Sequence, residues 1–279
     1  MRTVCDSQQG VWLKRAPGND PGRRGQPRQL ALGLCLAMSI LGSASTGAYA
    51  KAVVVGHDVN TLATFVSGAQ EDAFAVNVAD FLTAGSTTRN LLMFESNPGD
   101  GTRNFAPGVL AALTNAGFSI TVTSDYATPF STFDAVFVAQ DFPIVGFLDN
   151  TALINYVDGG GSVYVAGGVG PSPAGEAAGW SSFLNHYGLA FNGTSYNNLN
   201  SVAITSSHPI FAGITTLRSG NGQSILDLGT NANAQIVQFA GAQGTYAVVN
   251  VPVPEPATVV LFGAGLLALA CVGRRRVAQ

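Results

Sequence analysis

The sequence predicts an α/β domain with a mostly parallel sheet and helices on both of its faces. Between residues 52 and 187, short apolar runs typical of strands alternate with segments of helical spacing, and this alternation is typical of α/β folds. After residue 202 the pattern changes to short β segments. The stretch between two export-type terminal segments is about 200 residues long, which suits one domain with a sizeable core.

The strands and helices of this domain follow from local patterns. AVVVG at 52–56 predicts a buried strand, and further strands are expected at 90–95 (NLLMFE), 119–123 (SITVT), 133–139 (FDAVFVA) and 162–166 (SVYVA). Helices are expected at 71–84, 104–116, 150–157 and 175–187. The first helix places Phe74, Val78 and Phe81 on one side, while Gly117 ends the second helix and the GGG run at 159–161 ends the third.

The C-terminal part of the domain is expected to extend the sheet. Short β segments are predicted around 225–228, 235–239 and 246–251. They would add antiparallel strands to one edge, as mixed sheets often do. The predicted architecture of residues 51–251 is therefore flavodoxin-like, with extra β segments near its C-terminus.

Residues 1–50 have the organisation of a secretory leader. Arginines precede an apolar run at 30–41 (LALGLCLAMSIL), and small residues ending in Ala48-Tyr49-Ala50 follow it. This order predicts a signal peptide cleaved after Ala50, and hence passage through the Sec translocon. The leader is unusually long, so a later translation start stays open, as does twin-arginine export because of Arg23-Arg24.

The last residues have the composition of a membrane anchor. The 17 residues from Ala257 to Gly273 carry no charge and would rise about 26 Å as a helix, against a hydrocarbon core of about 30 Å. Arg274, Arg275 and Arg276 follow, and arginines stay on the cytoplasmic side, so the bulk of the chain is expected outside the cytoplasm. A plain anchor or a buried core helix is the alternative interpretation.

The same tail resembles a known sorting signal. Val253-Pro254-Glu255-Pro256, a short apolar stretch and the terminal arginine cluster resemble, in this order, the PEP-CTERM signal of Gram-negative bacteria. The resemblance implies that exosortase, a membrane-embedded cysteine protease, recognises Pro254, Glu255 and Pro256 and removes the anchor at 252–279. It further implies transfer from the inner membrane to the cell surface or extracellular matrix, in association with exopolysaccharide and biofilm formation.

Charge and cysteine content exclude several functions for the mature region. Residues 51–250 hold 4 basic and 13 acidic residues, a difference of −9, which excludes nucleic acid as a ligand. The chain's cysteines, Cys5, Cys35 and Cys271, lie in the leader and the anchor. The predicted domain therefore has no disulfide, thiolate metal site or cysteine nucleophile.

The central part of the domain resembles the class I glutamine amidotransferase-like superfamily, including its ThuA-like branch. The resemblance is carried by 91–95 (LLMFE), 113–118 (LTNAGF), 133–137 (FDAVF), 154–165 (INYVDGGGSVYV) and 208–214 (HPIFAGI). In active members a nucleophilic cysteine follows the strand that corresponds to 162–166. Gly168 stands at that position here, so the resemblance does not imply amidotransferase chemistry.

The carboxyl ends of the predicted strands supply a candidate ligand site. Ligands of open parallel sheets bind at this edge, where the sequence places His57, Asp58, Glu95, Asn97, Gln140 and Asp141. Histidine with carboxylates suits acid–base chemistry or a divalent cation, although loop residues are polar for simpler reasons. We assign no catalytic residue, resident metal or cofactor. His186 is expected to be packed or at the surface, His208 to fix a loop, and Trp180, Tyr187 and Tyr196 to lie in the core rather than to stack on sugars.

Two classes of function follow from these patterns. The first is a non-enzymatic surface or matrix protein associated with exopolysaccharide. The second is an extracytoplasmic hydrolase or sugar-active enzyme that uses the strand-end histidine and carboxylates. The sequence has no nucleophile motif such as G-x-S-x-G, which favours the first class.

Overall fold

A computed structural model describes residues 51–63, 68–95, 104–140, 149–167, 172–197 and 200–251. The predicted signal peptide and sorting signal lie outside the described residues. Within them, no helix is long and apolar enough to cross a membrane.

The described chain forms a mixed α/β fold. Its strands are β1 (Lys51–Gly56), β2 (Asn90–Glu95), β3 (Ser119–Thr123), β4 (Ala135–Gln140), β5 (Ser162–Gly167), β6 (Leu189–Asn197), β7 (Ser201–Ala203), β8 (Thr216–Arg218), β9 (Asn221–Asp227), β10 (Ala234–Ala240) and β11 (Gln243–Val251). Its α-helices are α2 (Ala69–Leu82), α3 (Pro107–Asn115), α4 (Asn150–Asp158) and α5 (Pro173–His186). Short 3₁₀ helices are η1 (Val59–Leu62), η2 (Phe130–Thr132) and η3 (Pro209–Phe211).

The large sheet has a parallel half and an antiparallel half. Its order is β3-β2-β4-β5-β1-β11-β9-β6, with β10 also paired to β11. The pairs from β3 to β1 are parallel, and β11 runs antiparallel to β1. Counted from β2, the parallel strands follow the flavodoxin order 2-1-3-4, but β1 takes the place of the fifth strand. β7 and β8 form a separate two-stranded sheet.

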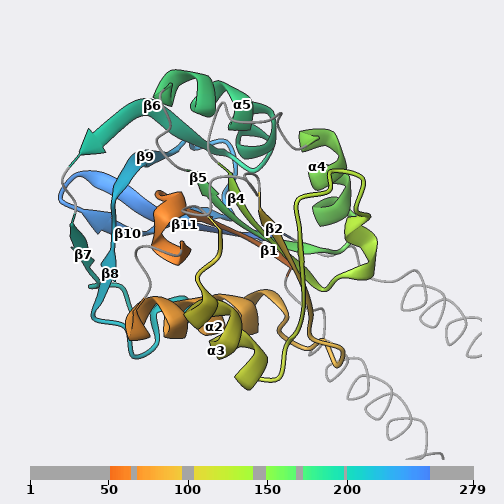
Figure 1. Ribbon diagram of the computed structural model, residues 1–279. Coiled ribbons are helices and arrows are strands. Elements are labelled where there is room, and N and C mark those ends of the chain that lie inside the picture. The colour runs from red at the N-terminus through yellow and green to blue at the C-terminus, as the bar shows by residue number, and fades with distance from the viewer. Residues whose placement is uncertain are drawn as a thin grey trace, which may run out of the picture. The chain divides into compact units, whose positions relative to one another are not determined.

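Helices cover both faces of the parallel half, as the alternation predicts (Figure 1). Successive residues of a strand point to opposite faces. Val54 therefore packs in the cluster that α2 and α3 cover, together with Phe74 and Leu113. Val53 and Val55 pack in the opposite cluster, which α4 and α5 cover.

The strand register defines two ends of the parallel half. At the amino end, Asn90 is paired with Ser119, Ala135 with Ser162, and Lys51 with Val251. At the carboxyl end, Glu95 is paired with Ala139, Gln140 with Gly167, and Gly56 with Tyr246. These two ends, called the amino end and the carboxyl end below, carry different polar contacts.

Several elements depart from the predicted ranges by one to four residues, β7 and β8 were not predicted, and two further differences have a clear local cause. α3 begins at Pro107 rather than at 104, because proline fixes a φ suited to the first helical turn and Ala106 before it is extended. β6 was not predicted. Its sequence LAFNGTSYN contains Asn192-Gly193-Thr194, which favours a turn, and its pairing with β9 shifts register between Phe191 and Ser195.

Candidate functional site

His57 follows β1 directly and is fully enclosed at the carboxyl end. Its N–H donates to the Thr245 carbonyl at 2.9 Å, and its carbonyl accepts from the Gln223 N–H at 2.9 Å. The main chain of His57 thus joins β11 to β9. Burial lowers the pKa of the imidazole from 6.5 to about 4, against the opposing effect of Asp58, so His57 is neutral at pH 7.

Asp58 holds a loop that is distant in the sequence. Its Oδ1 accepts from the Asn60 N–H at 2.8 Å, which makes Asp58 the N-cap of η1. Its Oδ2 accepts from the Ser219 hydroxyl at 3.1 Å and from the N–H groups of Gly220 and Asn221. The buried carboxylate is therefore occupied by donors from the β8–β9 connection and from η1.

Two buried tyrosines lie beside this pair. The Tyr246 hydroxyl lies 3.4 Å from the Thr61 hydroxyl, and its ring meets the His57 ring edge to face at 5.5 Å. The Tyr164 hydroxyl is buried and has no hydrogen-bond partner among the described residues. It lies under Gly56, where a Cβ would come within 2.7 Å of the oxygen. The glycine at the end of β1 therefore leaves the space that Tyr164 fills.

A second buried carboxylate, Glu176, lies on the opposite face of the sheet. It stands in the first turn of α5, and its Oε2 accepts from the Gln223 Nε2 at 2.9 Å. The Gln223 Oε1 in turn accepts from the Gly193 N–H at 3.1 Å, which ties α5 to both β9 and β6. Glu176 was not among the predicted site residues. The signal was its position four residues before Trp180, on the apolar side of a helix whose Phe183 and Leu184 are also buried.

Glu95 is the half-buried carboxylate of the predicted site. It ends β2, and its Oε1 accepts from the Phe105 N–H at 3.1 Å. Burial raises the pKa of Glu95, while this hydrogen bond opposes the shift. The backbone of Gln140 lies one residue beyond the Glu95 partner on β4. Asn97 and Asp141, like the Gln140 side chain, lie outside the description.

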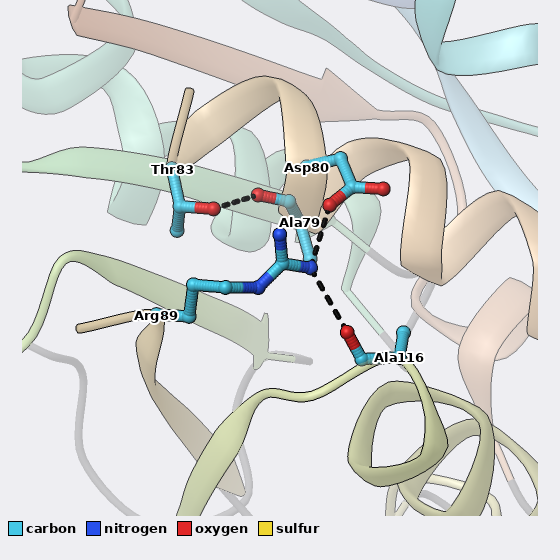
Figure 2. A network of polar contacts seen from close by, with 5 residues as sticks. All are labelled: Ala79, Asp80, Thr83, Arg89 and Ala116. Carbon is cyan, nitrogen blue, oxygen red and sulfur yellow. Dashed lines mark hydrogen bonds and ion pairs between the residues drawn. The ribbon is translucent and has the colours of Figure 1, made fainter. Parts of the chain in front are cut away.

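The amino end carries a different network, centred on Arg89 (Figure 2). One guanidinium nitrogen donates to the Asp80 carboxylate of α2 at 2.7 Å and to the Ala116 carbonyl at 3.2 Å, just after α3. The guanidinium also lies over the Phe118 ring at 3.9 Å. Next to it, the Thr83 hydroxyl donates to the Ala79 carbonyl at 2.7 Å and closes the end of α2. Arg89 therefore fixes two helices to the start of β2.

Asp134 performs a similar task beside β4. Its Oδ2 accepts from the Asn90 N–H and from the Thr88 hydroxyl, both at 2.7 Å. Burial acts to raise the pKa of Asp134, but hydrogen bonds from Asn90, Thr88 and Ser86 together outweigh it and lower that pKa. The carboxylate is thereby held ionised at the surface of the amino end.

The other histidines and aromatic residues have local contacts. His186 is exposed and lies 3.3 Å from the Asp158 carboxylate. His208 caps η3, its Nδ1 accepting from the Ile210 N–H at 3.4 Å, and burial lowers its pKa. Trp180 and Tyr187 are buried in the cluster under α5. The Tyr196 side chain lies outside the description.

The buried polar residues at the carboxyl end near β1 connect strands and loops within the domain. His57, Asp58 and Glu176 are buried and hold elements that are 47 to 188 residues away in the sequence. Over the described ranges, no group of three or more histidine, cysteine, aspartate or glutamate side chains is arranged to hold a metal ion. Glu95, on β2, is the carboxylate of this end that combines partial exposure with a raised pKa.

Comparison with protein families identifies the tail. The model of the PEP-CTERM protein-sorting motif matches residues 252–276, which begin directly after the last residue of β11. No curated protein and no solved structure matches the chain. The amidotransferase-like resemblance of the domain therefore rests on its sequence motifs alone. The chain carries a PEP-CTERM motif, which implies export and processing by exosortase toward the cell surface.

Proposed function

We propose that this chain is an exosortase substrate whose α/β domain, 51–251, acts at the cell surface as a non-catalytic component associated with exopolysaccharide. The observation that carries the proposal is the PEP-CTERM motif at residues 252–276. A leader at 1–50 with cleavage after Ala50 would bring the chain to the membrane through the Sec translocon. The apolar stretch at 257–273 would hold it in the inner membrane of a Gram-negative cell until processing.

The position of the motif relative to the fold supports sorting of a folded domain. β1 begins at Lys51 and β11 ends at Val251, and these two residues are paired across neighbouring strands. Cleavage after Ala50 and removal of the anchor would therefore leave the described strands intact. The processed protein would keep the sheet on which the domain is built.

The contacts at the carboxyl end support a binding role over catalysis. A catalytic acid or base must reach its substrate, whereas His57, Asp58 and Glu176 are enclosed and bonded to distant loops and strands. Gly168 also stands where active members of the class I glutamine amidotransferase-like superfamily, which the domain resembles, carry their nucleophilic cysteine. The domain would thus use its surface rather than a reactive side chain.

A second candidate function is an extracytoplasmic hydrolase or sugar-active enzyme. It is favoured by Glu95, whose pKa is raised by burial at the ligand-binding end of the sheet. Gln140 follows the partner of Glu95 on β4, and Asp141 comes next in the sequence. A pair of carboxyl groups, here Glu95 and Asp141, is the set of groups that glycoside hydrolysis employs.

The sorting proposal is tested in a strain with exosortase and in its exosortase deletion. We expect intact mass spectrometry to show loss of the C-terminal residues, and fractionation to show release from the membrane, in the first strain alone. A variant with Pro254, Glu255 and Pro256 replaced by alanine should keep its anchor in both strains. An anchor that is retained by the unaltered chain in both strains would overturn the proposal.

The role of the domain is tested with the processed protein. We expect it to co-sediment with exopolysaccharide from the producing strain and to release no reducing sugar from it. The Glu95→Gln variant should bind equally well if the domain only binds. Release of sugar by the unaltered protein that is lost in Glu95→Gln would establish the enzymatic alternative instead.

A further inference from the structure

The two ends of the folded domain leave the sheet side by side. β1 and β11 are paired over six residue pairs, from Lys51 with Val251 to Gly56 with Tyr246. Because β11 runs antiparallel to β1, its last residue lies at the amino end of the parallel half. The sorting motif begins at the next residue, so it is attached to the amino end and not to the ligand-binding end.

The tether between the domain and the predicted anchor is short. Five residues, Pro-Val-Pro-Glu-Pro, separate Val251 from Ala257. Six Cα steps reach at most about 22 Å when fully extended. Because three of the five residues are prolines, the rise per residue of a polyproline II helix describes the tether better, and it gives a length of about 19 Å.

The domain is longer than this tether along the strand direction. β11 has nine residues, from Gln243 to Val251, and therefore spans about 26 Å. The exposed turn at 241–242 lies beyond its far end. A tether that reaches at most about 22 Å keeps Val251 within that distance of the bilayer, and so excludes the upright inverted orientation, in which Val251 would stand about 26 Å above a membrane-bound turn.

We propose that, while the anchor is attached, the amino end of the sheet faces the lipid headgroups and the carboxyl end faces away from the membrane. This orientation rests on the proposed function, because it requires the apolar stretch 257–273 to lie in a bilayer. The short tether determines this orientation, and attraction between charges does not. The positive charges of Lys51 and Arg89 at the amino end are balanced by the negative charges of Asp80 and Asp134. The unprocessed protein thus turns Glu95 and its neighbours outward, toward the matrix.

Two exposed alanines at opposite ends of β10 provide a matched test. Ala232 precedes β10 at the amino end, where Ala234 is paired with Val249. Ala242 follows β10 in the turn at the other end, where Ala240 is paired with Gln243. Both are exposed, and the described domain contains no cysteine. Ala232→Cys and Ala242→Cys therefore accept a single dye, once Cys5, Cys35 and Cys271 are replaced by alanine.

The experiment uses the full chain from an exosortase deletion strain, inserted into vesicles of neutral lipid that carry a headgroup quencher. We expect severalfold stronger quenching of the dye at Ala232→Cys than at Ala242→Cys. Insertion of about 20 Gly/Ser residues between Val251 and Pro252, which adds about 25 Å of flexible reach, should bring the two values together.

The outcomes separate the orientation from the function on which it rests. Equal quenching at the two positions of the vesicle-bound chain, or stronger quenching at Ala242→Cys, overturns the orientation alone. If the full chain does not co-float with the vesicles and stays in the aqueous fraction, residues 257–273 do not insert into the membrane. This result would overturn both the proposed anchor and the orientation that depends on it. A difference between the two positions that persists unchanged after the insertion would show that the tether does not set the orientation.

Discussion

The two ends of the parallel sheet use polar residues in opposite ways. At the amino end, Arg89 and Asp80 keep 35% and 51% of their side chains exposed while they bind each other, and Arg89 also donates to the Ala116 carbonyl. At the carboxyl end of β1, His57 and Asp58 are completely enclosed. Groups that stay near water lose little when a partner is removed, whereas enclosed groups depend on every partner they have. The polar residues after β1 therefore act as part of the core.

The largest effect should come from the enclosed carboxylate. Asp58→Ala removes the acceptor of four donors, three of which belong to residues 219–221. Because buried donors left without an acceptor cost about 1–3 kcal/mol each, we expect a loss of about 4 kcal/mol in the free energy of unfolding, measured by urea denaturation.

Asp134→Ala is the matched control at the amino end. It also removes an acceptor of main-chain and hydroxyl donors, but these donors are near the surface and can turn to water. We expect a loss of about 1 kcal/mol. Equal losses for the two variants would show that the two ends do not differ in the way proposed.

Acid should act on the same enclosed end through His57. The pKa of His57 is about 4 in the folded chain and 6.5 in the unfolded chain, so the unfolded chain binds more protons between these values. The free energy of unfolding therefore keeps its full value above pH 6.5. Protonation of His57 in the unfolded chain lowers it by about 3 kcal/mol as the pH drops to about 4. The urea midpoint measured across this range should show the decline.

A pair of histidine variants isolates this contribution. His57→Gln should flatten the decline, since it removes the group that must be buried uncharged. His186→Gln alters an exposed histidine and should keep the decline of the unaltered chain. A decline that is the same in both variants would assign the acid sensitivity to other groups.

Removal of the Arg89 side chain should have a smaller effect. Arg89→Ala breaks the ion pair with Asp80 and the contact with the Phe118 ring. Since the pair is partly exposed, we expect a loss of about 1 kcal/mol that shrinks as salt is added. Arg89→Lys should recover part of it. A loss as large as that of Asp58→Ala would place Arg89 among the groups on which the core depends.

The smallest effect, with the opposite sign, is expected for Tyr164→Phe. The Tyr164 hydroxyl is buried with no hydrogen-bond partner among the described residues, so its removal should be neutral or stabilise by up to about 1 kcal/mol. Tyr246→Phe removes a hydroxyl that lies 3.4 Å from Thr61 and should destabilise slightly. Thermal unfolding of the two variants under one condition distinguishes the signs.

Much of the parallel half was predictable because its signals are local. The predicted strand at 119–123 has the bounds of β3, and the strand at 90–95 has those of β2. Helix ends were less certain, since the shift of α3 depends on one proline. β6 has no comparable local pattern: Asn192 and Gly193 interrupt it, and its pairing with β9 holds it in the sheet.

The polar residues show why the candidate site was harder to predict. The sequence places His57 and Asp58 after a strand, where loop residues are normally exposed. Their partners, Gln223, Thr245 and residues 219–221, are more than 160 residues away, and no local pattern connects them. Glu176 was not predicted as a buried residue, because a glutamate on a helix is usually exposed at the surface.

The position of Val251 has a mechanical consequence. β11 is not an edge strand, since β1 lies on one side of it and β10 on the other. A pull between an anchor at Val251 and a matrix held at the opposite end of the sheet would act along the strands, across the direction of their hydrogen bonds. The six pairs with β1 would then share the load and fail together rather than open one by one. If the proposed link to exopolysaccharide holds, this pairing would let the domain carry tension between the anchor and the material outside the cell.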